Sequence, residues 1–596
     1  MVGNWEAWVA LEIIMVFSTS LILSFAATPG LIRLGYQLRV LDLPDNADKT
    51  DSPTGPRKIH LKAIPRLGGL GILIGFFLSN FIWEGLSPIA GILGASILLF
   101  VTGIIDDVRN LTPWTRLIVQ ITAATAAVFY GNLSLTTLAF SSDIIFSIPQ
   151  WQGFLLSIFV IVGAINSINL IDGLDGLAGG IVFIGIALLG FSHFLLTRDS
   201  HVLALISFPI MGSLLGFLRF NTYPASIFMG DGGSSWLGFM VGILMLFTLN
   251  LISIDPEAST LVTPNSKALV LAPFTSVILC LGIPVFDTLL VIISRLKRRQ
   301  NPLRPDRNHF HHHLLRLGLT QSQSVVAIYF IALTTGICGI APIAFPVYNL
   351  WWAPWLGLIA IPSIMILVSR SGRNDKVTIF SIILSHWPGV ARVSPRLKKL
   401  LRYWEGANRY TIYLLIIVMP FFAGVAPRPL GIAAAYAAGI IFFTLFIPTR
   451  KMDFLQHFMI TIAACVLLTA ININYLTIQI GGRTYSVHGL YNATYIWLFV
   501  STLFHIIVTF RRNYLHISPT DFLLVTVPLL LLLVPDPWNS EYRLGTISLK
   551  GLIFFMGMRT LVKRQFSILR RIKILLLAAL AFIAAVSLLQ LRLVYG

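Results

Sequence analysis

Long apolar runs, separated by short polar segments, fill most of the chain. A run of roughly 17 to 25 apolar residues is long enough for a helix to cross the hydrocarbon core of a bilayer. By this criterion the first 370 residues hold about eleven spans, which predicts a membrane bundle of α-helices. The spans lie near residues 8–27, 67–83, 89–105, 117–130, 153–171, 176–196, 202–218, 234–254, 268–294, 324–346 and 350–369.

A polar stretch over residues 371–409 interrupts this pattern, and we interpret it as a cytoplasmic linker with room for one amphipathic helix. About seven further spans follow by the same length rule. They lie near residues 410–425, 430–447, 454–473, 490–510, 521–534, 547–561 and 573–592. The pattern therefore predicts an all-α polytopic membrane protein. Its parts are a membrane domain (1–370), a linker (371–409) and a C-terminal transmembrane module (410–596) of unassigned function.

The composition agrees with a membrane protein. Of the 596 residues, 56% are hydrophobic and only 11% are charged, with a mean hydropathy of +0.83. Soluble domains carry about 25% charged residues, so a soluble globule of this length would lack a polar shell. Cys280, Cys338 and Cys465 lie in apolar runs without paired spacing, which argues against a disulfide framework or a zinc site. Soluble enzymes, secreted disulfide scaffolds and disordered chains are excluded.

The net charge of +19 bears on orientation. In a soluble protein it would suggest nucleic acid, but membrane proteins retain Lys and Arg in their cytoplasmic loops. With the N-terminus outside, the loops opposite the cytoplasm hold only Arg198 and Lys267 before residue 370. Glu6 precedes the first span and Arg33 follows it, the wrong charge order for a cleaved signal peptide. We expect a retained first span, a multi-pass topology and no nucleic-acid partner.

Five carboxylates follow predicted spans on the same side of the membrane. Asp106 and Asp107 end the third span in GIIDDVRNLTPWTR, Asp172 and Asp175 follow the fifth in NSINLIDGLDGLAGG, and Asp231 follows the seventh in FNTYPASIFMGDGGSS. Ionised groups near membrane depth are costly and usually functional. Several hard oxygen ligands in one water-accessible pocket suit Mg²⁺, which binds one or two carboxylates together with substrate phosphates.

Each carboxylate also has a plainer interpretation. An adjacent acid pair at a helix end is often a solvated loop, and Asp231 before GGSSWLGF could simply cap the next helix. Three segments that place acids on one face of an acid-poor chain are harder to explain in this way. The glycines beside these acids would let the backbone approach a phosphate closely.

A histidine tract, RPDRNHFHHHLLRLG, follows the ninth span. His-rich tracts suggest metal binding, but no cysteine or ordered histidine pair here gives zinc geometry. A diphosphate fits this tract better, because an arginine guanidinium can donate two parallel hydrogen bonds to a phosphate and an imidazole can donate another near neutral pH. A solvated positive loop explains Arg307 well but explains His309, His311 and His312 poorly.

These motifs together resemble the polyprenyl-phosphate N-acetylhexosamine-1-phosphate transferases, the membrane enzymes typified by WecA, TagO and MraY. FVTGIIDDVRNLT, NSINLIDGLDGLAGG, NTYPASIFMGDGGSS and PDRNHFHHHLLRLGL occur in family order between about residue 28 and residue 320. The tract DRNHFHH is closer to the WecA and TagO branch. The resemblance implies a bundle of the MraY and WecA type for residues 1–370 and says nothing of residues 371–596.

The resemblance also implies roles for residues. Asp106 and Asp107 match the acids assigned to activation of the lipid phosphate, with Asp106 either deprotonating or positioning the nucleophile, and Asp231 completes the catalytic set. Asn169 and Asp231 match metal-binding positions. The expected substrate-binding residues are Arg116, Asp172, Asp175 (at a uracil-contacting position), Asn221, Phe228 (stacked on uracil), Arg307, His309, His311 and His312. Arg116 stands where relatives often carry lysine.

The implied reaction transfers N-acetylhexosamine-1-phosphate, with GlcNAc-1-phosphate preferred, from a UDP-sugar to undecaprenyl phosphate and releases UMP. It would start cell-surface glycan assembly at the cytoplasmic face of the bacterial inner membrane. Mg²⁺ is the expected cofactor, with Mn²⁺ as the alternative, and the expected partners are UDP-N-acetylhexosamine, polyprenyl phosphate and the bilayer. Whether the chain forms a homodimer stays open.

A transporter or lipid-linked-sugar flippase is the competing hypothesis, because glycine-interrupted spans and buried acids occur there too. Such a protein should carry its acids near mid-membrane in inverted repeats. The acids here lie at one face and no repeat is visible, so this alternative, together with a polymerase, applies mainly to residues 410–596.

Overall fold

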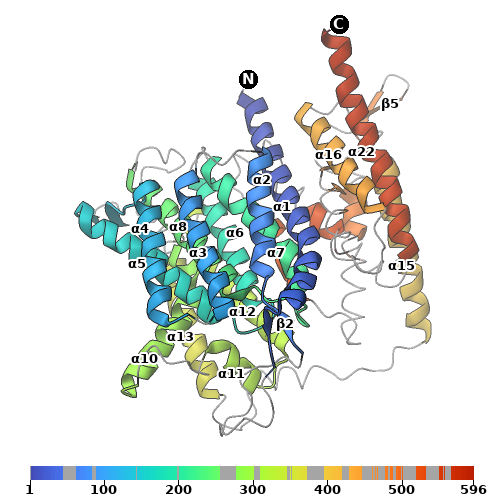
Figure 1. Ribbon diagram of the computed structural model, residues 1–596. Coiled ribbons are helices and arrows are strands. Elements are labelled where there is room, and N and C mark those ends of the chain that lie inside the picture. Colours follow the sequence, from blue (N-terminus) through green and yellow to red (C-terminus); the bar gives the residue numbers. More distant parts are fainter. Residues whose placement is uncertain are drawn as a thin grey trace. The chain divides into compact units, whose positions relative to one another are not determined.

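The computed structural model is mostly helical (Figure 1). It divides into two compact units: Val16–Thr378 with Ser518–Thr526, and Met1–Met15 with Ile379–Ile517 and Val527–Gly596. The residues that the structure describes are 2–44, 62–83, 89–109, 111–141, 144–196, 201–254, 277–300, 309–344, 350, 352–371, 395–418, 428–445, 460, 463–464, 466–467, 477–480, 483–486, 492–498, 500, 518–531, 549–554, 556 and 566–595.

The helices of the larger unit follow the predicted apolar runs closely. They are α1 (Val2–Leu38, whose first residues belong to the other unit), α2 (Gly68–Trp83), α3 (Ala90–Arg109), α4 (Pro113–Tyr130), α5 (Gln150–Ile171), α6 (Leu177–Leu196), α7 (His201–Asn221), α8 (Gly230–Ile254), α10 (Gly282–Lys297), α11 (Phe310–Arg316), α12 (Gln321–Ala344) and α13 (Ala353–Ser371). The span predicted near residues 268–294 is described only from residue 277 onward.

Five described helices are long and apolar enough to cross a membrane. They are Met15–Leu38, Ala90–Arg109, Gln150–Ile171, Gly230–Asn250 and Gln321–Pro342. Five shorter apolar helices accompany them, among them Gly68–Trp83 and Leu177–His193. These helices agree with a multi-pass membrane protein, while the predicted numbers of eleven and seven spans stay predictions.

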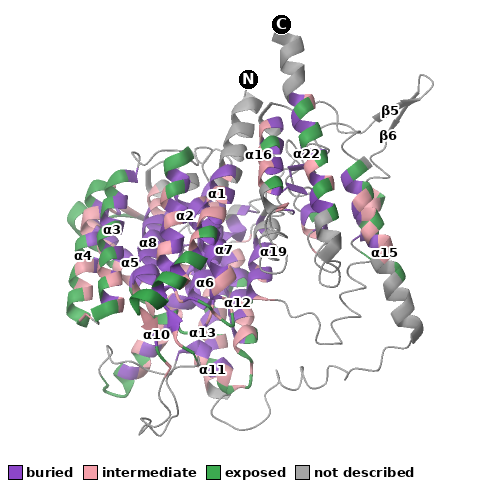
Figure 2. Cartoon of the chain, turned by 45° about the vertical axis from the view of Figure 1, so that its right-hand side comes forward, coloured by how far each residue is buried: buried purple, intermediate pink, exposed green. Residues whose placement is uncertain are grey.

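α8 forms the centre of the larger unit. It packs against α3, α5, α6 and α2. In its most apolar stretch 89% of the residues are buried, compared with 39% in the corresponding stretch of α5. Figure 2 shows buried residues gathered on α6, α7 and α8, with exposed residues on α3, α4 and α5. Glycines permit the closest approaches: a Cβ on Gly69 would lie 2.6 Å from Cα of Gly233. The glycines of α2 therefore serve helix packing.

Short antiparallel strand pairs supplement the helices and were not predicted. β1 (Leu41–Asp42) pairs with β2 (Ile64–Pro65), and β3 (Thr137–Ser141) pairs with β4 (Ile144–Ser147) between α4 and α5. β5 (Thr477–Ile480) pairs with β6 (Arg483–Ser486) in the other unit. Each strand has five or fewer residues, so a search for helix-length apolar runs passes over them.

The smaller unit contains α15 (Pro395–Val418), α16 (Arg428–Leu445) and α22 (Phe566–Tyr595), with α16 packed closely on α22. The predicted linker and the predicted span at 410–425 meet within α15, because the basic segment continues its helix into the apolar run. α19 (Pro519–Leu531) begins in the segment assigned to the larger unit, where the Phe522 ring lies 6.1 Å from that of Tyr329 on α12.

Candidate active site

The acid pair Asp106 and Asp107 lies in the last turn of α3, at the end of the third predicted span. The Asp107 carboxylate accepts hydrogen bonds from the backbone N–H groups of Asp231 (3.0 Å) and Gly232 (3.4 Å). These N–H groups open α8, where the helix dipole favours a negative charge. Two motifs separated by more than a hundred residues therefore meet at the start of the central helix.

Arg116, in the first turn of α4, joins two of the acids. Its Nε lies 2.7 Å from Oδ2 of Asp106 and its Nη1 lies 3.7 Å from Oδ2 of Asp231. Oδ1 of Asp106 accepts the N–H of Leu111 at 2.6 Å, so this buried carboxylate is engaged on both oxygens. A third of the Asp231 side chain stays exposed (33%), so Asp231 is more accessible to a ligand than Asp106.

Arg66 was not among the predicted site residues, yet it lies in the site. Its guanidinium pairs with the buried carboxylate of Asp42, and its Nη1 lies 3.9 Å from Oδ1 of Asp107. The pairing of β1 with β2 brings Asp42 and Arg66 together. The sequence signals that could have found these two residues are the first acid of LDLPDNADK, which is Asp42, and the arginine of IPRLGG, which is Arg66.

Asp172 follows α5 in the DGLDG loop and is exposed to water. The protein atoms crowded around it raise its pKa to about 7, and the charges of Asp231, Asp107 and Asp175 act in the same direction. Only the positive charge of Arg66 opposes them among the main causes. Asp172 is therefore exposed to solvent and lies close to three other negative charges.

Asp175 and Asn221 connect the DGLDG loop to the segment that precedes α8. Oδ2 of Asp175 accepts the N–H of Ala225 at 2.9 Å. The buried amide of Asn221 accepts the N–H of Gly176 at 3.1 Å and donates to the carbonyl of Ile227 at 2.9 Å. Both side chains thus shape the loop. Their predicted contacts with substrate stay predictions.

Phe228 is held by its backbone against the β2 segment. Its N–H donates to the carbonyl of Pro65 (2.7 Å), and its carbonyl accepts the N–H of Gly68 (2.9 Å) at the start of α2. The half-buried ring therefore sits three residues before Asp231 on a backbone fixed from both sides. This placement is compatible with the aromatic stacking role that the resemblance implies.

The histidine tract forms the short helix α11, beside the DGLDG loop. A Cβ on Gly173 would lie 2.6 Å from Nε2 of His311, so that backbone and the imidazole are in close contact. The His311 ring stacks parallel to His309 with centroids 5.9 Å apart, and His312 lies 4.2 Å away at a tilt of 44°. Figure 1 places α11, α10 and β2 at the same end of the larger unit.

His311 is almost completely buried, and among the described residues neither of its ring nitrogens has a hydrogen-bond partner. Burial lowers the pKa of His311 well below its usual value, and the charges of His312, His309 and His313 lower it further. The ring is therefore neutral at physiological pH. One nitrogen can then donate and the other accept, which suits contact with a polar ligand.

Asp287 is a second residue of the candidate site that was not predicted. It lies buried on α10, where its carboxylate binds both His309 and the backbone of Phe310. An isolated acid in the apolar segment GIPVFDTLLVIIS was the signal that could have found it.

The structure connects the other predicted residues to this site less directly. Asn169 is half-buried in the last turn of α5, and within the described residues its side-chain amide makes no hydrogen bond. Arg307 lies outside the described residues. Among the described residues, no three His, Cys, Asp or Glu side chains are grouped to hold a metal ion. The acids nevertheless fit Mg²⁺ chemically, because they supply hard oxygen donors near one another and a cation would offset their negative charge.

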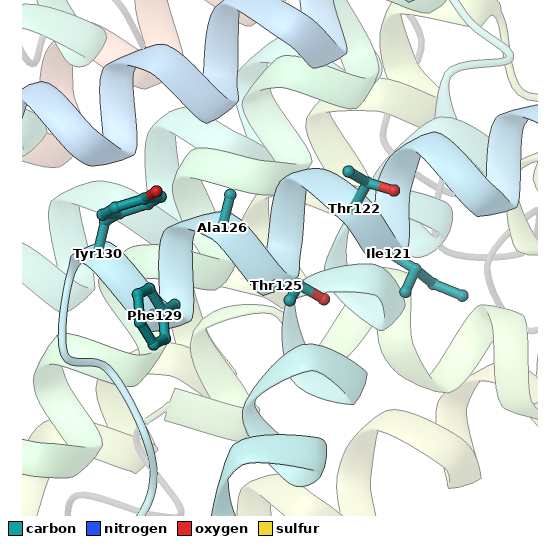
Figure 3. Close-up of a pocket in the computed structure, with 6 residues that line it drawn as sticks. All are labelled: Ile121, Thr122, Thr125, Ala126, Phe129 and Tyr130. Carbon is teal, nitrogen blue, oxygen red and sulfur yellow. The ribbon is translucent and has the colours of Figure 1, made fainter.

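A shallow apolar hollow of about 380 Å³ lies elsewhere, on the outer face of α4. Figure 3 shows that one helix supplies all of its lining side chains, Ile121, Thr122, Thr125, Ala126, Phe129 and Tyr130. None of these residues contacts the carboxylates of the site. We interpret this hollow as part of a lipid-facing surface rather than as the place of the chemistry.

Comparison with known proteins agrees with the motifs. Residues 89–249 match glycosyl transferase family 4. The probable undecaprenyl-phosphate N-acetylglucosaminyl 1-phosphate transferase of Bacillus subtilis (strain 168) is 32% identical over 376 residues, 62% of this chain and 96% of that protein. The decaprenyl-phosphate N-acetylglucosaminephosphotransferase of Mycobacterium leprae (strain TN) is 28% identical over 409 residues, 66% of this chain and 92% of that protein.

A third relative is the undecaprenyl-phosphate alpha-N-acetylglucosaminyl 1-phosphate transferase of Escherichia coli O157:H7, with 27% identity over 297 residues, 48% of this chain and 74% of that protein. The helical fold and these similarities define a multi-pass membrane phosphotransferase. The chain belongs to glycosyl transferase family 4, in the group of polyprenyl-phosphate N-acetylhexosamine-1-phosphate transferases typified by WecA and TagO. The resemblance seen in the sequence is confirmed.

Proposed function

We propose that the chain transfers N-acetylglucosamine-1-phosphate from UDP-N-acetylglucosamine to undecaprenyl phosphate, releases UMP and so begins assembly of a cell-surface glycan. A phosphate oxygen of the lipid attacks the β-phosphorus, the bond between the β-phosphorus and the bridging oxygen breaks, and that oxygen leaves with UMP. The names of the three relatives support N-acetylglucosamine-1-phosphate as the transferred group and a polyprenyl phosphate as the acceptor.

The observation that carries this proposal is the meeting of Asp107, Asp231 and Arg116 at the start of α8. The transfer brings two anions together, so the site must offset charge at the reacting phosphates. Arg116 and Arg66 supply cationic donors there, while Asp231 keeps a carboxylate partly open to solvent. Buried Asp106 and Asp107 hold Arg116 and the first N–H groups of α8 in place.

Mg²⁺ would be held by Asp231 and Asn169, with Asp172 nearby, and when bound it would polarise the diphosphate and stabilise the charge of the transition state. The lipid phosphate has a second pKa near 6, so much of it is dianionic at neutral pH without help from the protein. Asp106, whose two oxygens are engaged by Leu111 and Arg116, fits positioning better than proton abstraction.

The site lies on the cytoplasmic side in this proposal. Asp107, Asp172 and Asp231 sit at or beyond helix ends, whereas transporters bind substrate near the bilayer midplane. The basic segments follow these same helix ends, as the positive-inside rule expects for the bacterial plasma membrane. A transport, polymerase or docking role for residues 410–596 stays a separate prediction.

The test uses the purified full-length chain with undecaprenyl phosphate, Mg²⁺ and a panel of UDP-sugars, and measures UMP release. UDP-N-acetylglucosamine should be the best donor, and Asp231→Asn and Asp107→Asn should each abolish turnover. The matched control is Asp521→Asn, a buried carboxylate at the start of α19, which should keep turnover. No UMP release from any UDP-sugar by the wild type would overturn the proposal.

A further inference from the structure

Asp287 stands out as a buried charge that the proposed reaction does not use. It lies on α10 with only 4% of its surface exposed, in an otherwise apolar helical segment. A buried carboxylate is costly unless hydrogen bonds satisfy it. Oδ1 accepts the N–H of Phe310 and Oδ2 contacts Nδ1 of His309, each at 2.8 Å.

Both contacts are made to the start of α11. Seven residues are too few to form a stable helix alone, so α11 depends on what anchors it. Its contacts with α12 and α13 position the helix, but the Asp287 carboxylate fixes its first turn and the ring of His309 at once. The parallel stack of His309 on His311, and the contact of His311 with Gly173, extend from that fixed ring.

The hydrogen bond also determines which nitrogen of His309 carries a proton. An ionised carboxylate can only accept, so Nδ1 must be the donor. Nε2 has no hydrogen-bond partner within the described residues and is left for a ligand. An amide at position 287 would still accept from Phe310 but would donate to Nδ1, and it would thereby place the proton on Nε2.

We propose that Asp287 is a positioning residue for the transfer reaction, because it holds His309 in the orientation and tautomer that bind the diphosphate of the UDP-sugar. This inference rests on the proposed function for the identity of the ligand. Asp287 itself touches no substrate. It acts through His309, which contacts the β-phosphate that UDP has and UMP lacks.

The test compares Asp287→Asn with Thr288→Val, the next residue on α10, in the full-length protein with Mg²⁺. Affinities for UDP and for UMP are measured by calorimetry, and unfolding temperatures check the fold. Asp287→Asn should weaken UDP binding by about 10- to 100-fold, as the loss of a ligand-orienting partner typically does, and leave UMP binding unchanged. Thr288→Val should change neither. Wild-type affinity for UDP, or equal losses for both nucleotides, overturns the inference.

A double-mutant cycle separates positioning from general packing. His309→Asn keeps a donor toward Asp287 but removes Nε2, and it should show the same UDP-specific loss. Asp287→Asn in the His309→Asn background should add no further loss, whereas additive losses overturn the inference. If Asp287→Asn does not give monodisperse protein, His309→Asn is tested alone. Unaltered UDP binding by His309→Asn would then overturn the inference.

The two proposals fail in different ways. Binding of UDP and UMP is measured without turnover. The positioning role of Asp287 is therefore tested whether or not the wild type releases UMP. If the wild type releases UMP normally while Asp287→Asn binds UDP with wild-type affinity, that result would support the proposed function and contradict the positioning role of Asp287.

Discussion

Nη1 of Arg66 lies 3.9 Å from Oδ1 of Asp107, while the same guanidinium pairs with Asp42. The first loop after α1 therefore supplies one of the positive charges of a site whose acids come from α3, α5 and α8. A basic residue of this loop, which also fits the positive-inside rule, thus reaches the candidate site.

Arg66→Gln should lower kcat/KM for UMP release by about 10²- to 10³-fold, the range for loss of one charge-stabilising donor at a reacting centre. The variant leaves Asp107 and Asp172 without the arginine that offsets their charge. Steady-state UMP release measures the effect, and Arg33→Gln, an exposed arginine on α1, is the control. Equal activity of the two variants would contradict a role for Arg66 in the site.

Arg116 should tolerate lysine better than glutamine, because lysine keeps the positive charge. Its guanidinium reaches Asp106 through Nε and Asp231 through Nη1, whereas a single ammonium can serve only one of them well. We expect Arg116→Lys to retain about a tenth of kcat/KM, a cost near 1.4 kcal/mol, and Arg116→Gln to retain far less. Similar losses in both variants would show that charge at this position does not matter.

The raised pKa of Asp172 predicts a pH dependence of stability. Its pKa of about 7 lies above the value near 3.9 expected in the unfolded chain, so the folded state binds more protons between about pH 4 and pH 7. The free energy of unfolding should therefore fall as pH rises through this window. Unfolding temperatures in EDTA should drop more for the wild type than for Asp172→Asn.

Adding Mg²⁺ should reduce that difference, since a bound cation favours the ionised carboxylate. Removal of Mg²⁺ with EDTA should likewise stop UMP release, and restored Mg²⁺ should recover it. A wild type and an Asp172→Asn variant with parallel pH profiles would show that Asp172 does not titrate in this window.

Gly173→Ala should disturb the contact between the DGLDG loop and α11. The added Cβ would lie 2.6 Å from Nε2 of His311, so the buried ring or the loop must move. KM for the UDP-sugar should rise by about 10-fold, with a smaller change in kcat, as expected for lost ground-state binding. Gly163→Ala on α5 meets open space and is the matched control. An unchanged KM in Gly173→Ala would separate His311 from the binding of substrate.

The helices of the larger unit could be predicted because the bilayer sets a minimum apolar length that their sequences meet. α2, α6 and α12 begin and end within a few residues of the predicted runs. The ends were harder where charge continues a helix, since α3 includes Asp106 and Asp107 in its last turn. The β3–β4 pair was missed because its strands are too short to register as spans.

The site was predicted in its composition but not in its connections. Asp107, Asp172, Asp231 and the histidines were found because acids and imidazoles are unusual at the ends of apolar runs. Arg66 was not selected, because a basic residue in that loop is also expected from the positive-inside rule and nothing in the sequence distinguishes the two roles. Asp287 was passed over because its partner, His309, is distant in sequence, and only the packing of α10 beside α11 brings them together.

The closeness of Gly173 to His311 has a consequence for biosynthesis. All five acids leave the ribosome before His311, since even the last of them, Asp231, precedes it by about eighty residues. A nascent chain halted between α8 and α10 would contain these acids without His311. If the proposed function holds, such a chain should transfer no phosphosugar, because the buried imidazole that lies against Gly173 is still missing.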